Sequence, residues 1–152
     1  MTVTVRRATD VDADAVRAVG HATWPATYTF APVGYVEHGL ATYWSDEVVR
    51  RGLREMPTWV AEVDGEVVGM ANLDQRRDPP VIWKLYVVPS AQGTGAGTAL
   101  MNAAIAEAAG PVRLEYADGN DRAAAFYARL GFVEIERLAK PEGPDQVWLE
   151  RP

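Results

Sequence analysis

Three glycines at alternate positions form the segment of the sequence best suited to bind a ligand through its backbone. They lie in the run Gln92-Gly93-Thr94-Gly95-Ala96-Gly97, between an apolar segment typical of a strand and a segment whose apolar residues recur at helical spacing. Because glycine has no Cβ atom, the backbone can bend tightly here and bring its amides close to a ligand. Together with the positive end of the following helix, such amides can bind a phosphate or pyrophosphate.

Two common nucleotide-binding motifs do not fit this run. The phosphate loop of nucleotide hydrolases ends in Gly-Lys-Ser/Thr, whereas Gly97 is followed by Thr98 and Ala99. A dinucleotide-binding G-x-G-x-x-G pattern would need a glycine at position 98. Glu115 does lie about twenty residues further on, where a ribose-binding acid is expected, but it cannot replace the missing glycine. The run alone therefore predicts an anion site and leaves the anion open.

The remaining chemistry must come from oxygen atoms and the backbone, because the chain has no cysteine and only two histidines. Disulfides and thiolate sites are excluded, and we expect no metal. A net charge of −6 argues against a nucleic acid partner, because the phosphate backbone requires a basic surface, and it slightly favours an amine substrate. The first residues lack the apolar core of a signal peptide and no apolar stretch is long enough to span a membrane, so we expect a cytoplasmic protein with no membrane partner.

We expect an α/β protein in which one mixed, mostly antiparallel sheet of six to seven strands is flanked by about four helices, as a single domain over residues 1–152. The strands are predicted at 2–7, 58–63, 66–73, 81–88, 112–116, 132–137 and 146–150. The helices are predicted from Thr9 to about Gly20, over 45–55, from the glycine run to Gly110, and from Asn120 to Gly131.

Three segments carry most of this prediction. Asp64-Gly65, between two β-rich runs, is the signal for a tight hairpin. The segment 81–88 is nearly all apolar, and its residues are mostly β-branched or aromatic, as expected for one central strand covered on both faces. The segment 21–44 is rich in aromatic rings and is interrupted by Pro25 and Pro32, so we expect a loop with a short helix there.

Two spaced motifs resemble those of the GNAT superfamily of N-acetyltransferases. The first is Leu85-Tyr86-Val87-Val88-Pro89 followed by Gln92-x-x-Gly95-x-Gly97, which is similar to the acetyl-CoA pyrophosphate motif of that superfamily. The second, Asn120-x-x-Ala123-x-x-x-Tyr127-x-x-x-Gly131-Phe132, is similar to its downstream signature. The resemblance covers about Trp59 to Phe132, and it implies transfer of an acetyl group from acetyl-CoA to an amine.

The resemblance implies which residues bind the cofactor. The amides of Gly93 to Gly97 would bind the pyrophosphate, and the backbone of Tyr86 to Val88 would pair with the pantetheine arm like an added strand. Asn120 would contact the cofactor, although an ordinary helix N-cap also explains this residue. The full set expected at the cofactor is Leu85, Tyr86, Val87, Val88, Gln92, Gly93, Thr94, Gly95, Ala96, Gly97, Thr98, Asn120 and Tyr127.

Acetyl transfer requires that a proton leave the amine and that, usually, another reach the departing coenzyme A sulfur. The resemblance assigns the second role to Tyr127, which at its helical spacing could otherwise be an ordinary core residue. In some family members the base is a glutamate early in the central strand. The comparable position here is near Val81, where the sequence has no acidic residue. Glu115 matches the acid that other members place in the strand before the asparagine.

The role of Glu115 is open on sequence alone. It is either the catalytic base or a structural carboxylate that is solvated, faces a dimer partner or pairs with Arg113. Asp74, Glu62 and water are the alternative bases. A homodimer is also left open.

The aromatic residues Trp24, Tyr28 and Tyr35 match the region that forms the acceptor site in the superfamily. Most aromatic residues of this kind simply belong to the core. A cationic acceptor would gain roughly 0.5–2 kcal/mol from such rings. The expected acceptor is a primary amine of an unidentified small molecule or peptide. The rival predictions are a non-catalytic acetyl-CoA-binding module and an α/β nucleotide-binding protein.

Overall fold

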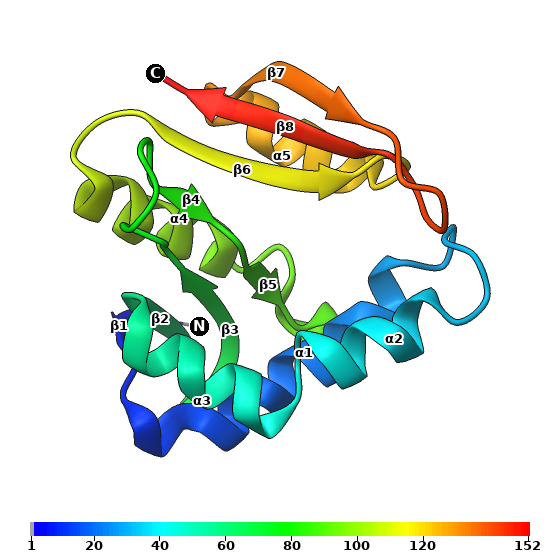
Figure 1. Ribbon diagram of the computed structural model, residues 1–152. Coiled ribbons are helices and arrows are strands. Elements are labelled where there is room, and N and C mark those ends of the chain that lie inside the picture. The colour runs from blue at the N-terminus through cyan, green and yellow to red at the C-terminus, as the bar shows by residue number, and fades with distance from the viewer. Residues whose placement is uncertain (1) are drawn as a thin grey trace.

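The computed structural model describes residues 2–152 (Figure 1). The elements in chain order are β1 (Val3–Arg7), α1 (Ala13–Thr27), α2 (Tyr35–Thr42), α3 (Asp46–Glu55), β2 (Thr58–Val63), β3 (Glu66–Asn72), β4 (Val81–Ile82), β5 (Leu85–Val87), α4 (Ala96–Ala108), β6 (Val112–Ala117), α5 (Asp121–Arg129), β7 (Val133–Leu138) and β8 (Gln146–Arg151). Short 3-10 turns at Asp10–Asp12 and Pro89–Ala91 precede α1 and the glycine run. No helix in this part of the chain has the length and apolar character needed to cross a membrane.

The strands form two four-stranded sheets, ordered β1-β2-β3-β5 and β4-β6-β8-β7. All neighbouring strands are antiparallel except β4 and β6, which are parallel. In Figure 1, β6, β7 and β8 lie with α5 at the top, and β1 to β3 lie below them near α1 and α3. The mixed α/β class is confirmed, with eight strands in two sheets instead of six to seven in one, and with five helices.

The single central strand predicted over 81–88 is wrong. The chain divides there into β4, which pairs with β6, and β5, which pairs with β3 in the other sheet. Apolar composition cannot reveal such a division, because apolar residues predominate in both halves. The division is what opens the molecule between β5 and β6.

The hairpin of β2 and β3 follows its sequence signal. Asp64 and Gly65 have φ angles of 53° and 80°, the positive values that a two-residue hairpin turn of this type requires. Side chains on β3 alternate between two apolar clusters, as they must on a strand. Met70 packs toward the helical layer that contains α1, whereas Ala71 packs with Leu100 of α4. The hairpin prediction is confirmed.

The predicted end of the first helix at Gly20 is wrong, because α1 continues to Thr27 and contains Pro25 in its last turns. Gly20 serves packing instead. A Cβ atom there would lie 2.0 Å from the Trp44 ring, and one at Gly39 would lie 2.0 Å from the Trp24 ring. The two glycines therefore let two indoles approach helix backbone closely, and much of the segment expected as a loop is helical.

The remaining helices agree with the sequence to within a few residues. Ser45 Oγ accepts a hydrogen bond from Val48 N at the start of α3. The helix after the glycine run ends at Ala108, where Ala109 takes the positive φ of 54° instead of Gly110, the predicted stop. Gly131, with φ of 92°, follows α5 as predicted.

Candidate active site

The opening between the two sheets begins at one residue pair. In the parallel register of β4 and β6, Val81 lies opposite Arg113 and Ile82 opposite Leu114. The next pair would be Trp83 and Glu115, but at Trp83 the chain leaves β6 and joins β3 as β5. Trp83 and Glu115 therefore lie on the two walls at the point where the sheets separate.

A buried amide side chain fixes the backbone at this point. Asn72 Oδ1 accepts hydrogen bonds from the amides of Trp83 and Lys84, at 3.2 and 2.9 Å, and Asn72 N donates to Lys84 O at 3.0 Å. Asn72 is 4% exposed, so these amides would otherwise lack a partner out of water. The Asn72 side-chain oxygen thus accepts a hydrogen bond from the amide of each of the two residues at which the chain turns away from β6.

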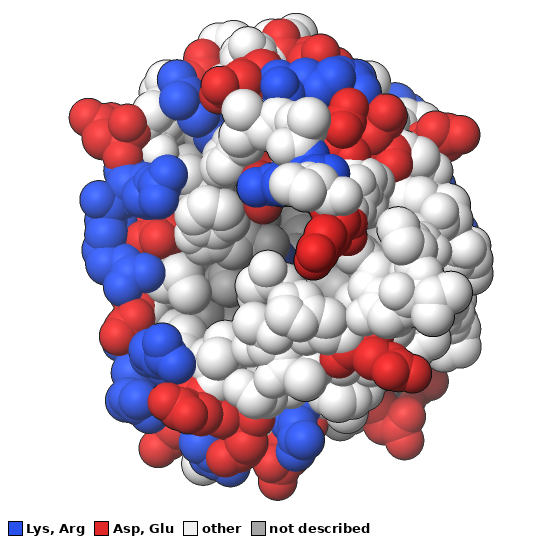
Figure 2. Space-filling model, turned by 45° about the vertical axis from the view of Figure 1, so that its right-hand side comes forward, with Lys and Arg blue, Asp and Glu red and all other residues white. Residues whose placement is uncertain are grey.

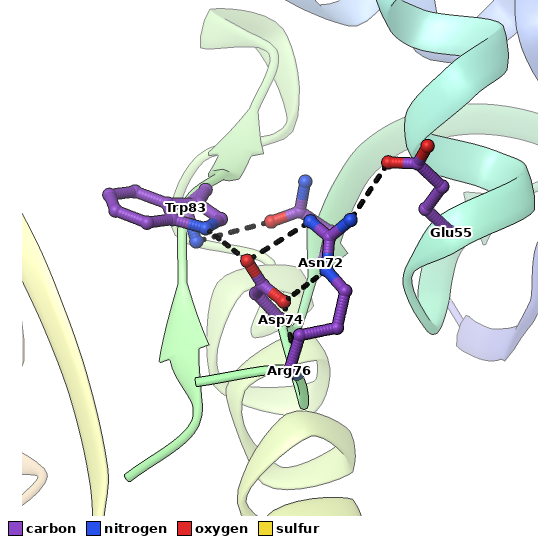
Figure 3. Close-up of polar contacts among 5 residues, drawn as sticks. All are labelled: Glu55, Asn72, Asp74, Arg76 and Trp83. Atoms are coloured by element: carbon purple, nitrogen blue, oxygen red, sulfur yellow. Dashed lines mark hydrogen bonds and ion pairs between the residues drawn. The ribbon is translucent and has the colours of Figure 1, made fainter. Parts of the chain in front are cut away.

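The Trp83 indole is fixed by a second group (Figure 3). Its Nε1 donates to Asp74 Oδ2 at 3.1 Å, and Asp74 also accepts from the Arg76 guanidinium at 2.8 Å. Arg76 reaches on to Glu55 of α3 at 2.9 Å. Hydrogen bonding from Arg76 lowers the pKa of Asp74 to about 2. Asp74, expected as an alternative base, is therefore an ion-paired carboxylate, and it lines neither cavity described below.

Two cavities meet at this opening. The first, of about 350 Å³, lies between β5, the glycine run and α5, and the second, of about 750 Å³, lies between α1, α2 and the segment before β8. The residues that line both are Tyr28, Trp83, Tyr86, Glu115 and Tyr116. Figure 2 shows a hollow near the centre of the face, with acidic and basic side chains at its edge. A ligand in either cavity would reach the same wall residues.

The glycine run provides unused hydrogen-bond donors to the first cavity. Gly93 and Gly95 have φ angles of 84° and 91°, and a Cβ atom on either would meet nothing within 4 Å. In residues 2–152, the amides of Gly93, Gly95, Gly97 and Thr98 donate no hydrogen bond to a protein acceptor. These amides lie at the positive end of α4, which begins at Ala96. Such a turn fits a pyrophosphate group.

The strand β5 offers a further backbone surface. It is the outer strand of its sheet, paired with β3 on one side only, and Leu85, Tyr86 and Val87 all line the first cavity. An extended ligand arm can therefore pair with the free edge of β5, as an added strand does. Gln92 Nε2 donates to Val87 O at 3.2 Å, beside this edge.

Three of the residues expected at the cofactor do not line the first cavity. Val88 packs in the apolar cluster near α1, and Ala96 is 1% exposed within the other cluster. Thr94 Oγ1 donates to Ala91 O at 2.6 Å, which stabilises the turn itself. The ten others, Asn120 and Tyr127 included, do line it. Asn120 Oδ1 also accepts from Ala123 N at 3.3 Å, so it caps α5 and faces the cavity at once.

Tyr127 lies in α5 and is 9% exposed, with the rings of Phe126, Phe132 and Tyr116 about it. Burial raises the pKa of Tyr127 well above its ordinary value. Its hydroxyl forms no hydrogen bond within the described chain, and the residue lines the first cavity. Tyr127 is therefore protonated at neutral pH and free to donate to a ligand.

Glu115 projects from β6 at the junction of the two cavities. Burial raises the pKa of Glu115, and the charge of Lys140 opposes the rise. The ion pair with Arg113 that was one explanation for Glu115 is not formed, because Arg113 Nε pairs with Glu150 at 2.9 Å. Glu62, the other alternative base, pairs with Arg6 at 2.6 Å and lines neither cavity.

The three aromatic residues expected at the acceptor lie at the second cavity, and Tyr28 lies at both. Tyr28 Oη and Tyr86 Oη are 3.0 Å apart, and the Trp24 ring stacks on that of Tyr35 at 5.7 Å. Trp24 and Tyr28 are also core residues, being 6% and 8% exposed. Core packing and cavity lining are thus combined in the same rings.

Sequence reasoning missed Trp83, Lys84 and Asn72. A signal for Lys84 was present, because it is the one charged residue in the run 81–88. Trp83 had no signal beyond its type, and the role of Asn72 depends on a division of the strand that the sequence does not reveal.

The family model described as the acetyltransferase (GNAT) family matches residues 17–132. The chain belongs to this family. It is accordingly an acetyltransferase, and the resemblance seen in its two motifs is confirmed.

Individual proteins similar to this GNAT domain are also acetyltransferases by name. An uncharacterized N-acetyltransferase of Mycobacterium tuberculosis is 37% identical over 131 residues, which cover 80% of this chain and 83% of that protein. A mycothiol acetyltransferase of Nocardia farcinica is 42% identical over 97 residues, covering 58% of this chain and 32% of that protein. The PaiA N-acetyltransferase of Thermoplasma acidophilum, solved in complex with coenzyme A, has the same fold, with a TM-score of 0.88 at 18% identity over 99% of both chains.

The hydrogen bonds and ion pairs that join Asp74 to Trp83 and Arg76 should stabilise this GNAT domain, and a substitution at Asp74 tests this. Asp74→Asn keeps the shape and removes the charge, and we expect it to lower the free energy of unfolding at pH 7 by about 1–3 kcal/mol. Arg76 is exposed, so solvent screening makes its ion pair with Asp74 weaker than a buried pair would be. Folding lowers the Asp74 pKa to about 2, so the stabilisation is complete above about pH 4 and is lost as the pH falls toward 2.

Urea unfolding at several pH values measures this difference, which should narrow below about pH 4. Glu66→Gln is the matched control, because Glu66 is exposed and forms no ion pair within residues 2–152. It should change stability by less than about 0.5 kcal/mol. Equal stability of Asp74→Asn and the parent at pH 7 would contradict the role given to Asp74.

Proposed function

We propose that this chain transfers an acetyl group from acetyl-CoA to a primary amine of a small molecule or peptide, by direct attack of the amine on the thioester. The observation that carries the proposal is the shared wall of the two cavities. One cavity has free amides suited to pyrophosphate, the other is lined with aromatic residues, and Glu115 lies where they meet. The alignment of 99% of the chain with 99% of one GNAT structure supports a single acetyltransferase domain over residues 1–152.

In this proposal the residues of the first cavity bind acetyl-CoA. The amides of Gly93, Gly95, Gly97 and Thr98 bind the pyrophosphate, and the free edge of β5 pairs with the pantetheine arm. The cofactor supplies an acetyl thioester, which the amine converts to an amide with release of the thiol. Bound along β5, the arm would point its thioester toward the opening where Glu115 lies.

Two side chains move the protons. Glu115 accepts a proton from the amine, directly or through one water, and the environment that raises its pKa makes it a stronger base than an ordinary glutamate. Tyr127 donates its proton to the departing sulfur. Burial keeps the hydroxyl protonated but raises its pKa and so makes it a weaker acid, and the donation therefore depends on the position of the hydroxyl beside the leaving group. One proton leaves the amine and one reaches the sulfur, so the transfer balances.

The direct test is a screen of amine pools with acetyl-CoA, in which released thiol is detected. Thiol release above the hydrolysis background would support transfer and would identify the acceptor at the same time. Binding of acetyl-CoA without thiol release from any amine would favour the non-catalytic binding module instead. A rise in melting temperature with ATP or NAD, with no rise with acetyl-CoA, would favour a nucleotide-binding protein.

The cofactor cavity is tested by a charge placed at the pyrophosphate site. Thr98 lies in the first turn of α4, where a glutamate is compatible with the helix, so Thr98→Glu should fold. A like charge within about 4 Å costs roughly 1–4 kcal/mol, so we expect acetyl-CoA to bind on the order of tenfold more weakly or worse. The rise in melting temperature with acetyl-CoA measures this.

Asn102→Glu is the matched control for that variant. Asn102 lies one turn further along α4, is exposed and lines neither cavity. It should keep the parent's thermal response to acetyl-CoA. A Thr98→Glu variant that also keeps it would contradict the placement of the pyrophosphate.

Removal of one hydroxyl tests the acid. Tyr127→Phe should fold and bind acetyl-CoA as the parent does, and kcat should fall roughly ten- to a thousandfold, because general acid catalysis contributes about 10²- to 10⁴-fold. Tyr116→Phe removes a neighbouring hydroxyl, with ring centroids 6.1 Å apart, and should cost much less. A parent-like kcat for Tyr127→Phe would return Tyr127 to a purely structural role.

The base is tested through pH. The raised pKa of Glu115 means that its base form is lost at a higher pH than the value of about 4.3 usual for glutamate, so activity should fall early on the acid side. Glu115→Gln should lower kcat/KM at pH 7, with partial recovery at high pH, where free amine is abundant. A kcat/KM profile from pH 5 to 10 measures both, and an unchanged profile in the variant would exclude Glu115 as the base.

A further inference from the structure

Lys84 brings a positive charge into the second cavity without a carboxylate to balance it. The residue is half-buried, lies between β4 and β5, and lines this cavity. Its Nζ donates to Tyr43 O and lies 4.1 Å from the centroid of the Trp44 ring. In residues 2–152, no carboxylate oxygen lies within 4.0 Å of Nζ.

The Lys84 ammonium group is partly desolvated and has no acidic partner nearby among the described residues. Burial lowers the pKa of Lys84 to about 8, which a nearby carboxylate would have prevented. The group is nonetheless mostly protonated at neutral pH. A carbonyl and a ring face satisfy it in part, and two of the three donors of the ammonium have no protein partner in the described chain. A charge-assisted bond to a ligand anion would use them.

The position of Lys84 relative to Glu115 gives the site two poles. Glu115 lies on the β6 wall at the opening, and Lys84 follows Trp83 on the facing wall. The other charged groups of the cavity, Lys140 and Glu142, are exposed and lie on the segment before β8. The interior of the cavity therefore has one carboxylate, suited to an amine, and one ammonium group, suited to an anion.

We propose that Lys84 binds a carboxylate of the acceptor, so that the substrate class is an amine that also carries a carboxylate, such as an amino acid or a short peptide. This inference rests on the proposed function, because it takes the second cavity as the acceptor site. The aromatic rings of Trp24, Tyr35 and Tyr43 complete the cavity and suit an apolar or aromatic side chain.

The test compares amino acids with their decarboxylated amines on the protein saturated with coenzyme A. Phenylalanine with phenethylamine, tyrosine with tyramine, and leucine with isopentylamine differ only in the carboxylate. Calorimetry should show that the amino acid binds at least tenfold more tightly in one or more pairs. Lys84→Met should reduce that ratio to about one, and Lys84→Arg should retain part of it.

Arg54→Met is the control, since it removes one positive charge from an exposed position of α3 that lines neither cavity. It should keep the preference for the amino acid. The thermal response to acetyl-CoA confirms that each variant is folded. The inference is overturned if no amino acid binds the parent, if the amines bind as tightly, or if the preference survives in Lys84→Met.

Thiol release separates this inference from the proposed function. Acetylation of the decarboxylated amines as efficiently as the amino acids would leave the transferase in place and overturn the role of Lys84. Lys84-dependent binding of amino acids without thiol release from any amine would support the carboxylate site and overturn the proposed transfer.

Discussion

The Asn72 side chain is the constraint on which the arrangement of the site depends. Its oxygen accepts from two successive amides, those of Trp83 and Lys84. Between the pair of Asn72 with Lys84 and the bridge of Asp74 with Val81, one strand advances two residues and the other three. The extra residue is a β-bulge, which bends a strand and re-aims its side chains. Without a buried acceptor, two amides would be left unpaired at a cost of about 1–3 kcal/mol each.

The consequences of that bulge extend to both cavities. Because the chain leaves β6 at Trp83, the outer edge of β5 has no paired strand within residues 2–152, and β6 loses its pairing with β4 beyond Leu114, just before Glu115. Asp74 then sets the direction of the Trp83 indole, and Arg76 connects the Asp74 carboxylate to Glu55 of α3 (Figure 3). Trp83, which lines both cavities, is thus held in place by the ion pairs of Asp74, Arg76 and Glu55, which lie outside the cavities.

The parts of the fold that sequence could predict are those set by local chemistry. Asp64-Gly65, the glycine run and the Asn120 cap each dictate backbone geometry within a few residues, and each was found where expected. The division of 81–88 involves a distant partner, Asn72. Gly20, which suggested a helix end, instead lies inside α1 and packs against the distant Trp44 ring. The first cavity follows largely from local motifs, whereas the second is assembled from segments around residues 24–44, 83–86, 115 and 140–146.

The charges of the protein are arranged differently at the two ends of the opening. A chain with net charge −6 presents backbone amides at its glycine run that are unpaired within the described residues, so an anion bound there would be held by the direction of these amides and not by excess basic residues. Burial raises the pKa of Tyr127 in the first cavity and that of Glu115 at the junction of the two cavities. A phenol is protonated at neutral pH in any case, and the raised pKa makes it a weaker acid, while the carboxylate becomes more basic. Desolvation of these two groups, one on α5 and one on β6, therefore leaves a protonated phenol and a carboxylate of increased basicity beside the same cavity.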